Sequence, residues 1–321
     1  MKYYLGIDLG GTDIKVGVID ERHTIVCKHS VPTRTGRPAG EIIADMAAAG
    51  RHALNTAGLG EADIGYVGLS VPSSINHNNN RLIFAPNLKW KDFDFIPCFK
   101  KEWDVPLYMA NDADSAALGE AMAGAARGYD NAVMLTLGTG IGGGLIMNRR
   151  VYVGGDGYGS EPGHIVIAMG GEKCGCGAYG CFEAYGSVTA LIRDTIRAID
   201  EYPDTVMRDI CGGDLARVDG RTPFKAASSG DPAGMKVVNN YIGYLATGIA
   251  TLIILLRPQV VILGGGVCNA GDPLFVPLRE SVTDRVRITG DVGIPPILKA
   301  ELGNDAGIIG AALLGVADDI N

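Results

Sequence analysis

A strand, a glycine-rich turn and a returning strand form a unit that occurs twice in this sequence of 321 residues. The first unit covers residues 3–19 around Gly10-Gly11-Thr12, and the second covers residues 132–147 around Gly138-Thr139-Gly140. Apolar runs bounded by glycine turns are typical of paired strands. Because the chain is also long for a single core, the repeat predicts an α/β protein with two domains of related topology.

Other regular elements indicate a mixture of strands and helices. We expect strands at residues 24–30, 64–71, 105–110 and 260–263, and helices at residues 41–57, 113–125, 187–200, 232–256 and 307–314. No stretch has the composition of a disordered linker, so the domain boundary is expected between Asn111 and Ala125. We predict a small lobe of residues 1–112, against which a C-terminal helix at 305–321 packs, and a large lobe of residues 113–304.

The glycine turns are candidate anion sites, because their backbone N–H groups can point at anionic oxygens. Asp8 ends the first strand beside the turn, where a carboxylate can hold magnesium through water or simply cap the turn. Thr12 and Thr139 would offer hydroxyl groups to phosphate. A third glycine segment, from Leu263 to Val267, follows a strand and would suit a flat ring. One glycine hairpin alone indicates little, but three such turns predict a nucleotide held between two domains.

Three of the seven cysteines, Cys174, Cys176 and Cys181, fall within eight residues, and His164 lies ten residues upstream. Three thiolates and an imidazole match the preference of tetrahedral zinc. Four protein ligands would leave no open position for water, so such a zinc ion would be structural. Free thiols in a reduced protein are the alternative, and an odd total of cysteines fits a disulfide framework poorly.

The composition argues against several classes of protein. The net charge is −8 and no basic block is present, which makes nucleic acid an improbable partner. The N-terminus begins almost at once with an apolar strand instead of a secretory signal. The most apolar stretch, residues 241–256, is shorter than the roughly 18 residues that a membrane span needs, so we expect a buried helix there. The expected compartment is the cytoplasm.

Taken together, the motifs resemble those of the ROK family of repressors and sugar kinases, nearly from end to end. The matching segments are Leu5 to Thr12, Ala85 to Leu88, Asn111 to Ala113, Leu137 to Gly144, Glu161 to His164, Cys174 to Glu183, and Leu263 to Val267. The resemblance implies an actin-like, ribonuclease H-like ATPase fold with two lobes, a cleft and a zinc loop. It also implies an ATP-dependent hexose kinase of carbohydrate metabolism and glycolysis, with glucose foremost, that forms a homodimer or larger homo-oligomer.

The resemblance also assigns roles by position. Asp112 would be the general base, although Asp is equally suited to cap the helix that follows. The residues that would hold sugar hydroxyls are Asn87, Asn111, Glu161, His164 and Glu183. Zinc would be bound by His164, Cys174, Cys176 and Cys181. The phosphates of ATP, with Mg²⁺, would lie against Asp8, Gly10, Gly11, Thr12, Gly138, Thr139 and Gly140, and the adenosine against Gly264, Gly265 and Gly266.

Three positions depart from the family pattern and leave the acceptor open. Asp13 is acidic within the first phosphate turn, Asp114 stands where Asn is common, and Val71 to Ile75 replaces a Gly-x-Pro-Gly loop. Fructose, mannose, allose or N-acetylmannosamine would be alternative acceptors. A sugar-sensing regulator of the same family without its DNA-binding domain is a further alternative, as is a sugar-binding protein without catalysis. The first phosphate turn begins within ten residues of Met1, which favours the enzyme.

Overall fold

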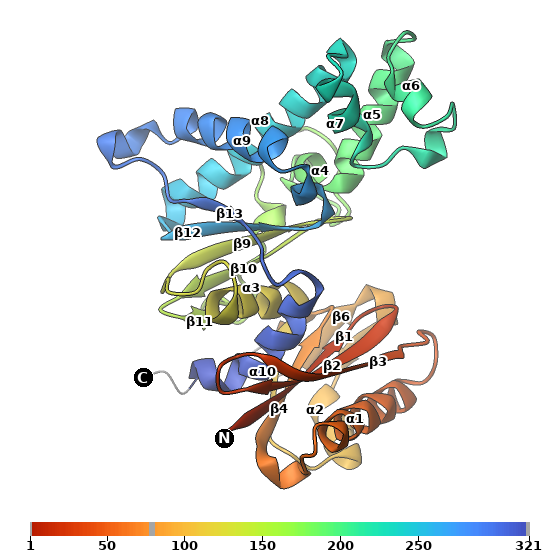
Figure 1. Ribbon diagram of the computed structural model, residues 1–321, viewed down its shortest axis with the longest axis vertical. Coiled ribbons are helices and arrows are strands. Elements are labelled where there is room, and N and C mark those ends of the chain that lie inside the picture. The colour runs from red at the N-terminus through yellow and green to blue at the C-terminus, as the bar shows by residue number, and fades with distance from the viewer. Residues whose placement is uncertain (1, 77–80, 319–321) are drawn as a thin grey trace. The chain divides into compact units, whose positions relative to one another are not determined.

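The structure is a computed structural model that describes residues 2–76 and 81–318 (Figure 1). The chain forms two compact units. The first holds residues 1–132, 144–160 and 300–321, and the second holds residues 133–143 and 161–299. These units divide the chain differently from the predicted lobes of residues 1–112 and 113–304, since residues 113–132 and 144–160 belong to the first unit.

A mixed five-stranded sheet with the order β3-β2-β1-β4-β8 forms the centre of the first unit. β1 (Tyr3–Leu9), β2 (Asp13–Asp20) and β3 (Ile25–Pro32) are antiparallel neighbours. β4 (Ile64–Val71) pairs with β1 in parallel, and β8 (Leu107–Asn111) pairs with β4 in parallel. The parallel strands therefore end at one common edge of the sheet.

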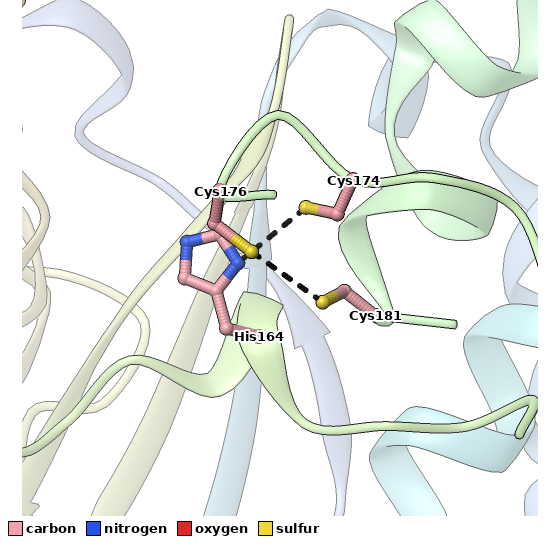
Figure 2. A group of neighbouring side chains, drawn as sticks. All are labelled: His164, Cys174, Cys176 and Cys181. Atoms are coloured by element: carbon pink, nitrogen blue, oxygen red, sulfur yellow. Dashed lines mark hydrogen bonds between the residues drawn. The ribbon is translucent and has the colours of Figure 1, made fainter. Parts of the chain in front are cut away.

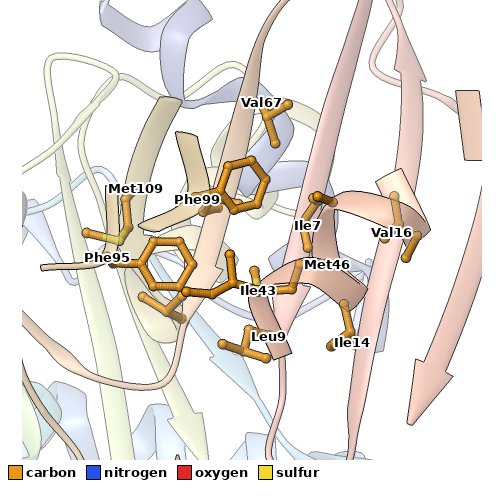
Figure 3. Close-up of a cluster of buried hydrophobic side chains, with 14 of the residues drawn as sticks. Ile7, Leu9, Ile14, Val16, Ile43, Met46, Val67, Phe95, Phe99 and Met109 are labelled. Carbon is orange, nitrogen blue, oxygen red and sulfur yellow. The ribbon is translucent and has the colours of Figure 1, made fainter. Parts of the chain in front are cut away.

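One face of this sheet carries the main hydrophobic core (Figure 3). Leu5, Ile7 and Leu9 alternate along β1 and are almost completely buried. They belong to the same cluster as Ile43 and Met46 of α1 (Ala39–Thr56). α2 (Phe95–Glu102), which we did not predict, adds Phe95 and Phe99 to the cluster. The apolar side chains that alternate along β1 and those at helical spacing in α1 therefore pack in the same core.

The other face lies directly against the C-terminal helix α10 (Ala306–Asp318). A Cβ atom at Gly68 of β4 would lie 1.7 Å from the carbonyl oxygen of Ala311. α10 also packs on α3 (Asp112–Ala123), where a Cβ atom at Gly310 would lie 1.6 Å from the carbonyl oxygen of Ser115. Only glycine permits such close backbone contacts. This packing explains why α3 belongs to the first unit and not to the predicted large lobe.

A second five-stranded sheet has the order β11-β10-β9-β12-β13. Its strands are β9 (Ala132–Leu137), β10 (Ile141–Met147), β11 (Arg150–Val151), β12 (Val260–Gly264) and β13 (Ile297–Lys299). In both sheets the order along the chain is the same: a run of three neighbouring strands, then two strands added beyond the first of them. The strand order therefore repeats, as the two strand–glycine–strand units predicted.

Most of the rest of the second unit is helical. They are α4 (Glu183–Gly186), α5 (Val188–Glu201), α6 (Met207–Ile210), α7 (Thr222–Ser228), α8 (Pro232–Leu256) and α9 (Asp272–Arg285). A small sheet of β5 (Ser74–Asn76), β6 (Arg81–Ala85) and β7 (Trp90–Phe93) belongs to the first unit. α9 and this small sheet were not predicted.

The helix α8 has 25 residues, and by length and composition alone it could cross a membrane. It is longer than the apolar stretch at 241–256 on which the prediction of a buried helix was based. In its most apolar window 61% of the helix is buried inside the protein, and it packs against α7 and α9. Because buried core helices pass the same test, this helix is weak evidence for a membrane span and fits the expected core helix.

A buried carboxylate joins α3 to the segment that leads into α10. Glu120 has no exposed surface, and its Oε2 atom accepts hydrogen bonds from the N–H groups of Ala125 at 2.8 Å and Glu301 at 3.2 Å. Its Oε1 atom accepts from the N–H group of Leu302 at 2.8 Å. One side chain therefore satisfies three backbone donors in two segments that are far apart in the sequence.

We predict that Glu120→Ala lowers the free energy of unfolding by about 3 kcal/mol, because three N–H donors lose a charged acceptor in a buried site. Urea denaturation monitored by circular dichroism measures the loss. The matched control is Glu280→Ala at an exposed position of α9, which should change stability by less than about 0.5 kcal/mol. Equal stability losses in the two variants would contradict the structural role of Glu120.

Candidate active site

The predicted catalytic and magnesium-binding carboxylates of the first unit lie at the edge where its parallel strands end. The register pairs Asp8 of β1 with Ser70 of β4, and Val71 of β4 with Asn111 of β8. Asp112 follows directly as the first residue of α3. Ligands of open α/β sheets bind outside the carboxyl ends of the strands, so this edge is a candidate site by topology.

Asp8 is held in place by a serine that sequence reasoning missed. The hydroxyl group of Ser70, which is fully buried, donates a hydrogen bond to Asp8 Oδ1 at 2.7 Å. Burial raises the pKa of Asp8, and the hydrogen bond from Ser70 and the charge of Lys15 only partly oppose this shift. A nearby cation would favour the charged carboxylate, so the environment is compatible with a magnesium ligand.

The first glycine turn is shaped by Thr33, a second residue that the motifs did not reveal. The fully buried Thr33 donates from Oγ1 to the carbonyl oxygen of Gly10 at 2.7 Å, and from its N–H group to the carbonyl oxygen of Thr12 at 2.8 Å. The N–H group of Gly10 donates to the carbonyl oxygen of Asp13 at 2.9 Å, which closes the turn. A Cβ atom at Gly11 would lie 3.7 Å from that of Asn87, so the structure brings these two predicted site residues together.

The alternative assignment of Asp112 as a helix N-cap is wrong, because Asn111 occupies that position. The Oδ1 atom of Asn111 accepts from the N–H group of Ala113 at 2.7 Å, and its Nδ2 atom donates to the carbonyl oxygen of Ser73 at 2.9 Å. Asp112 is exposed, and its Oδ1 atom lies 2.9 Å from the same N–H group of Ala113. The cap therefore orients the backbone at the junction of β8 and α3, where Asp112 lies.

The four predicted zinc ligands converge in the second unit (Figure 2). One ligand atom each from His164, Cys174, Cys176 and Cys181 lies within 4.8 Å of all the others. His164 Nδ1 is 3.7 Å from Cys174 Sγ, and Cys176 Sγ is 3.7 Å from Cys181 Sγ. A tetrahedral ion with Zn–S bonds of about 2.3 Å requires neighbouring sulfurs about 3.8 Å apart. The donor set and its spacing fit a structural zinc ion, and all seven cysteines are free thiols.

Glu183 connects this cysteine loop to the second glycine turn. Its Oε2 atom accepts a hydrogen bond from the N–H group of Ile141 at 3.0 Å, and Cys174 Sγ lies 3.5 Å from its Oε1 atom. Desolvation raises the pKa of Glu161, the charge of His164 lowers it, and the charge of Glu183 raises it. Glu161 therefore lies close enough to His164 and Glu183 for their charges to act on its pKa.

A cavity of about 510 Å³ in the second unit is lined by both remaining glycine segments. Gly138 and Thr139 lie on its wall, and their carbonyl groups accept hydrogen bonds from Val188 N at 2.9 Å and Thr189 Oγ1 at 2.7 Å. Thr189 is a further residue that the motifs did not reveal. Gly266 and Val267, which begin the turn after β12, also line the cavity.

Only glycine allows the third segment to approach β9 so closely. Gly265 has a φ angle of 105°, and a Cβ atom there would lie 2.1 Å from the carbonyl oxygen of Leu137. The structure therefore brings the second and third glycine segments to one cavity, where the sequence predicted phosphate and adenosine contacts.

The sequence profile of the ROK family matches residues 4–317. The chain belongs to the ROK family. A glucokinase from Thermotoga maritima is 35% identical over 309 residues, which cover 96% of this chain and 95% of that protein. An N-acetylmannosamine kinase from Yersinia pestis is 29% identical and covers 96% of this chain and 97% of that protein.

Two solved structures are similar to this ROK chain over nearly its full length. The ROK hexokinase from Thermus thermophilus has a TM-score of 0.82 and 33% identity, covering 98% of this chain and 99% of the other. The ROK family glucokinase from Streptomyces griseus, in complex with glucose and AMPPNP, has a TM-score of 0.77 and 31% identity, covering 97% and 98%. The α/β architecture with mixed sheets is therefore that of the ROK sugar kinases.

Proposed function

We propose that this ROK chain transfers the γ-phosphoryl group of ATP to a hexose, with glucose as the preferred acceptor and glucose 6-phosphate as the product. The chain is an ATP-dependent sugar kinase. We choose glucose because the chain is similar over nearly its full length to glucokinases, and the structure of one of them was solved with glucose and an ATP analogue. N-acetylmannosamine is the second candidate acceptor, because a kinase for that sugar is also similar.

Asp112 would accept the proton of the attacking hydroxyl group. A sugar hydroxyl is a poor nucleophile until a base lies within hydrogen-bond reach, and phosphoryl transfer otherwise depends on positioning and charge neutralisation. The cap formed by Asn111 supports this role, because it ties the backbone beside Asp112 to the carbonyl group of Ser73. Asn87, Glu161 and Glu183 would accept or donate hydrogen bonds to the other hydroxyl groups.

The metal cluster would be a structural zinc site that orients His164. Its Nδ1 atom faces the sulfur of Cys174, so Nδ1 would bind the metal and Nε2 would be left to donate to a sugar oxygen. Burial raises the pKa of the Cys174 thiol to about 12, so the metal would have to displace that proton on binding.

ATP would bind with Mg²⁺ at the glycine turns of an actin-like, two-lobed fold. The first and second turns would hold the phosphates, and Asp8 would hold Mg²⁺ through water. Gly264, Gly265 and Gly266 would contact the adenosine. Closure around both substrates would protect ATP from water. Homodimer formation and a cytoplasmic location remain predictions from the sequence.

A panel of hexoses tests the proposal. Glucose, mannose, fructose, allose and N-acetylmannosamine are each assayed with ATP and Mg²⁺ for ADP formation, and phosphorus NMR identifies the phosphorylated carbon. We expect the highest kcat/KM for glucose, and ADP release without sugar at least about 100-fold slower. A better acceptor than glucose would replace glucose in the proposal. Equal ADP release with and without every hexose would contradict the assignment of a sugar kinase.

A further inference from the structure

An arginine on the wall of the 510 Å³ cavity has no place in the roles assigned so far. The loop Asp219-Gly220-Arg221, just before α7, lines this cavity together with Gly138, Thr139 and Gly266. Arg221 belongs to none of the family motifs quoted above. Its side chain is 79% exposed, and Arg221 is one of the residues that line the cavity in which the nucleotide is proposed to bind.

Asp219 holds the guanidinium group of Arg221 in a defined orientation. Both Nε, at 2.8 Å, and Nη2 of Arg221 donate to Asp219 Oδ2. Asp219 Oδ1 accepts from the backbone N–H groups of Arg221 at 2.9 Å and Thr222 at 3.1 Å, so the carboxylate is itself anchored to the start of α7. Burial would raise the pKa of Asp219, but the hydrogen bonds from Arg221 outweigh burial and lower it. The ion pair thus occupies the Nε and Nη2 edge of the guanidinium and not its flat faces.

The remaining wall suits a flat aromatic ring. Val188, Ile192 and Val267 supply apolar surface, and Asn269 supplies a polar edge. Lys299 Nζ donates to Asn269 Oδ1 at 2.8 Å, so the Nδ2 group of this amide is the one left to donate to a ligand. A volume of about 510 Å³ lies within the range of small-ligand sites.

Charge indicates that Arg221 is not a phosphate ligand. Asp219 neutralises the arginine, and its carboxylate would repel an approaching phosphate. The glycine turn at Gly138 and Thr139, which lines the same cavity, is instead the proposed site of the phosphates. By contrast, a guanidinium plane stacks well on a π system even when one of its edges is paired.

We propose that Arg221 determines donor specificity by stacking its guanidinium plane on the nucleobase, with Asp219 as its positioning residue. The affinity for ATP and ADP then depends on the base, and a phosphate chain without a base gains nothing from Arg221. This inference rests on the proposed nucleotide site in the second unit.

Calorimetric titration of the full-length protein with ADP and with inorganic tripolyphosphate tests the proposal. Arg221→Ala should raise the Kd for ADP about tenfold and leave that for tripolyphosphate unchanged. Arg221→Lys should behave like the alanine variant, because lysine keeps the charge but lacks the plane. Arg217→Ala is the matched control: it removes the same charge from an exposed position four residues earlier, outside the cavity, and should bind ADP normally.

Steady-state kinetics provide the second measurement. Arg221→Ala should raise the KM for ATP about tenfold and leave both kcat and the KM for hexose unchanged. Equal weakening of ADP and tripolyphosphate would overturn the proposal in favour of a phosphate contact, and unchanged ADP affinity would overturn it outright. If the wild-type protein phosphorylates hexose and binds ADP, and Arg221→Ala binds ADP with the same affinity, only this inference fails. If the wild-type protein binds no ADP, the proposed function fails with it.

Discussion

Replacing Asp112 with asparagine is expected to lower kcat for hexose phosphorylation by about 1,000-fold, while the dissociation constant for hexose changes by less than about threefold. The amide keeps the size and the hydrogen-bonding shape of the side chain but cannot accept a proton at neutral pH. Steady-state kinetics give kcat, and calorimetry with the sugar gives the dissociation constant. A loss confined to turnover is what removal of a general base produces.

Asp114→Asn is the matched control for this experiment. Asp112 and Asp114 both lie in the first turn of α3, so each substitution removes one negative charge from the same helix N-terminus. Because Asp114 is buried, whereas Asp112 is exposed at the candidate site, we expect the kcat of Asp114→Asn to stay within about threefold of the wild type. Equal losses in the two variants would indicate that charge at the helix end matters, and unchanged turnover in Asp112→Asn would remove Asp112 as the base.

Loss of one cysteine ligand is expected to be the most damaging change in the second unit. In Cys181→Ser, bound zinc should fall from about one ion per chain to nearly none, and kcat/KM for hexose should fall about 100-fold or more. The reason is that the proposed metal would order the loop that carries His164 and leads to Glu183. Metal analysis by mass spectrometry and kinetics on the same sample measure both effects.

Cys98→Ser provides the comparison, because Cys98 is a half-buried free thiol that is not part of the cluster. This variant should retain zinc and activity. A strong chelator should inactivate the wild-type protein, and added Zn²⁺ should restore its activity. Unaltered zinc content in Cys181→Ser, or full activity of metal-free wild-type protein, would contradict the structural role of the cluster.

The elements that the sequence predicted well are those with a strong local pattern. β4 and α8 have the predicted bounds. Pro72 directly follows the end of β4, and Pro232 is the first residue of α8. The misses have weak or conflicting signals. α9 contains a proline, Pro277, inside the helix. β13 has only three residues, and it is a strand because it pairs with β12. The sequence also did not show that α3 belongs to the first unit, because this depends on contact between α3 and α10, which is distant in the sequence.

The residues of the candidate site also include some that the sequence revealed and others that it did not. The four residues of the metal cluster were found because three of them share one short loop with a recognisable spacing. Ser70, Thr33 and Arg221 were missed, because each acts on or beside a motif that is remote from it in the sequence. Sequence patterns reveal residues that recur within one segment, whereas supporting contacts between segments require the fold.

The contact between Glu183 and Ile141 has a practical consequence for enzyme engineering. Changing the acceptor range of a sugar kinase commonly begins with randomising the side chains that meet the sugar. Position 183 is a poor choice for such a library here, since its carboxylate also anchors the turn proposed to receive the donor phosphates. Varying the segment from Val71 to Ile75 would leave that anchor intact, so altered acceptor preference could be selected without a simultaneous loss of ATP use.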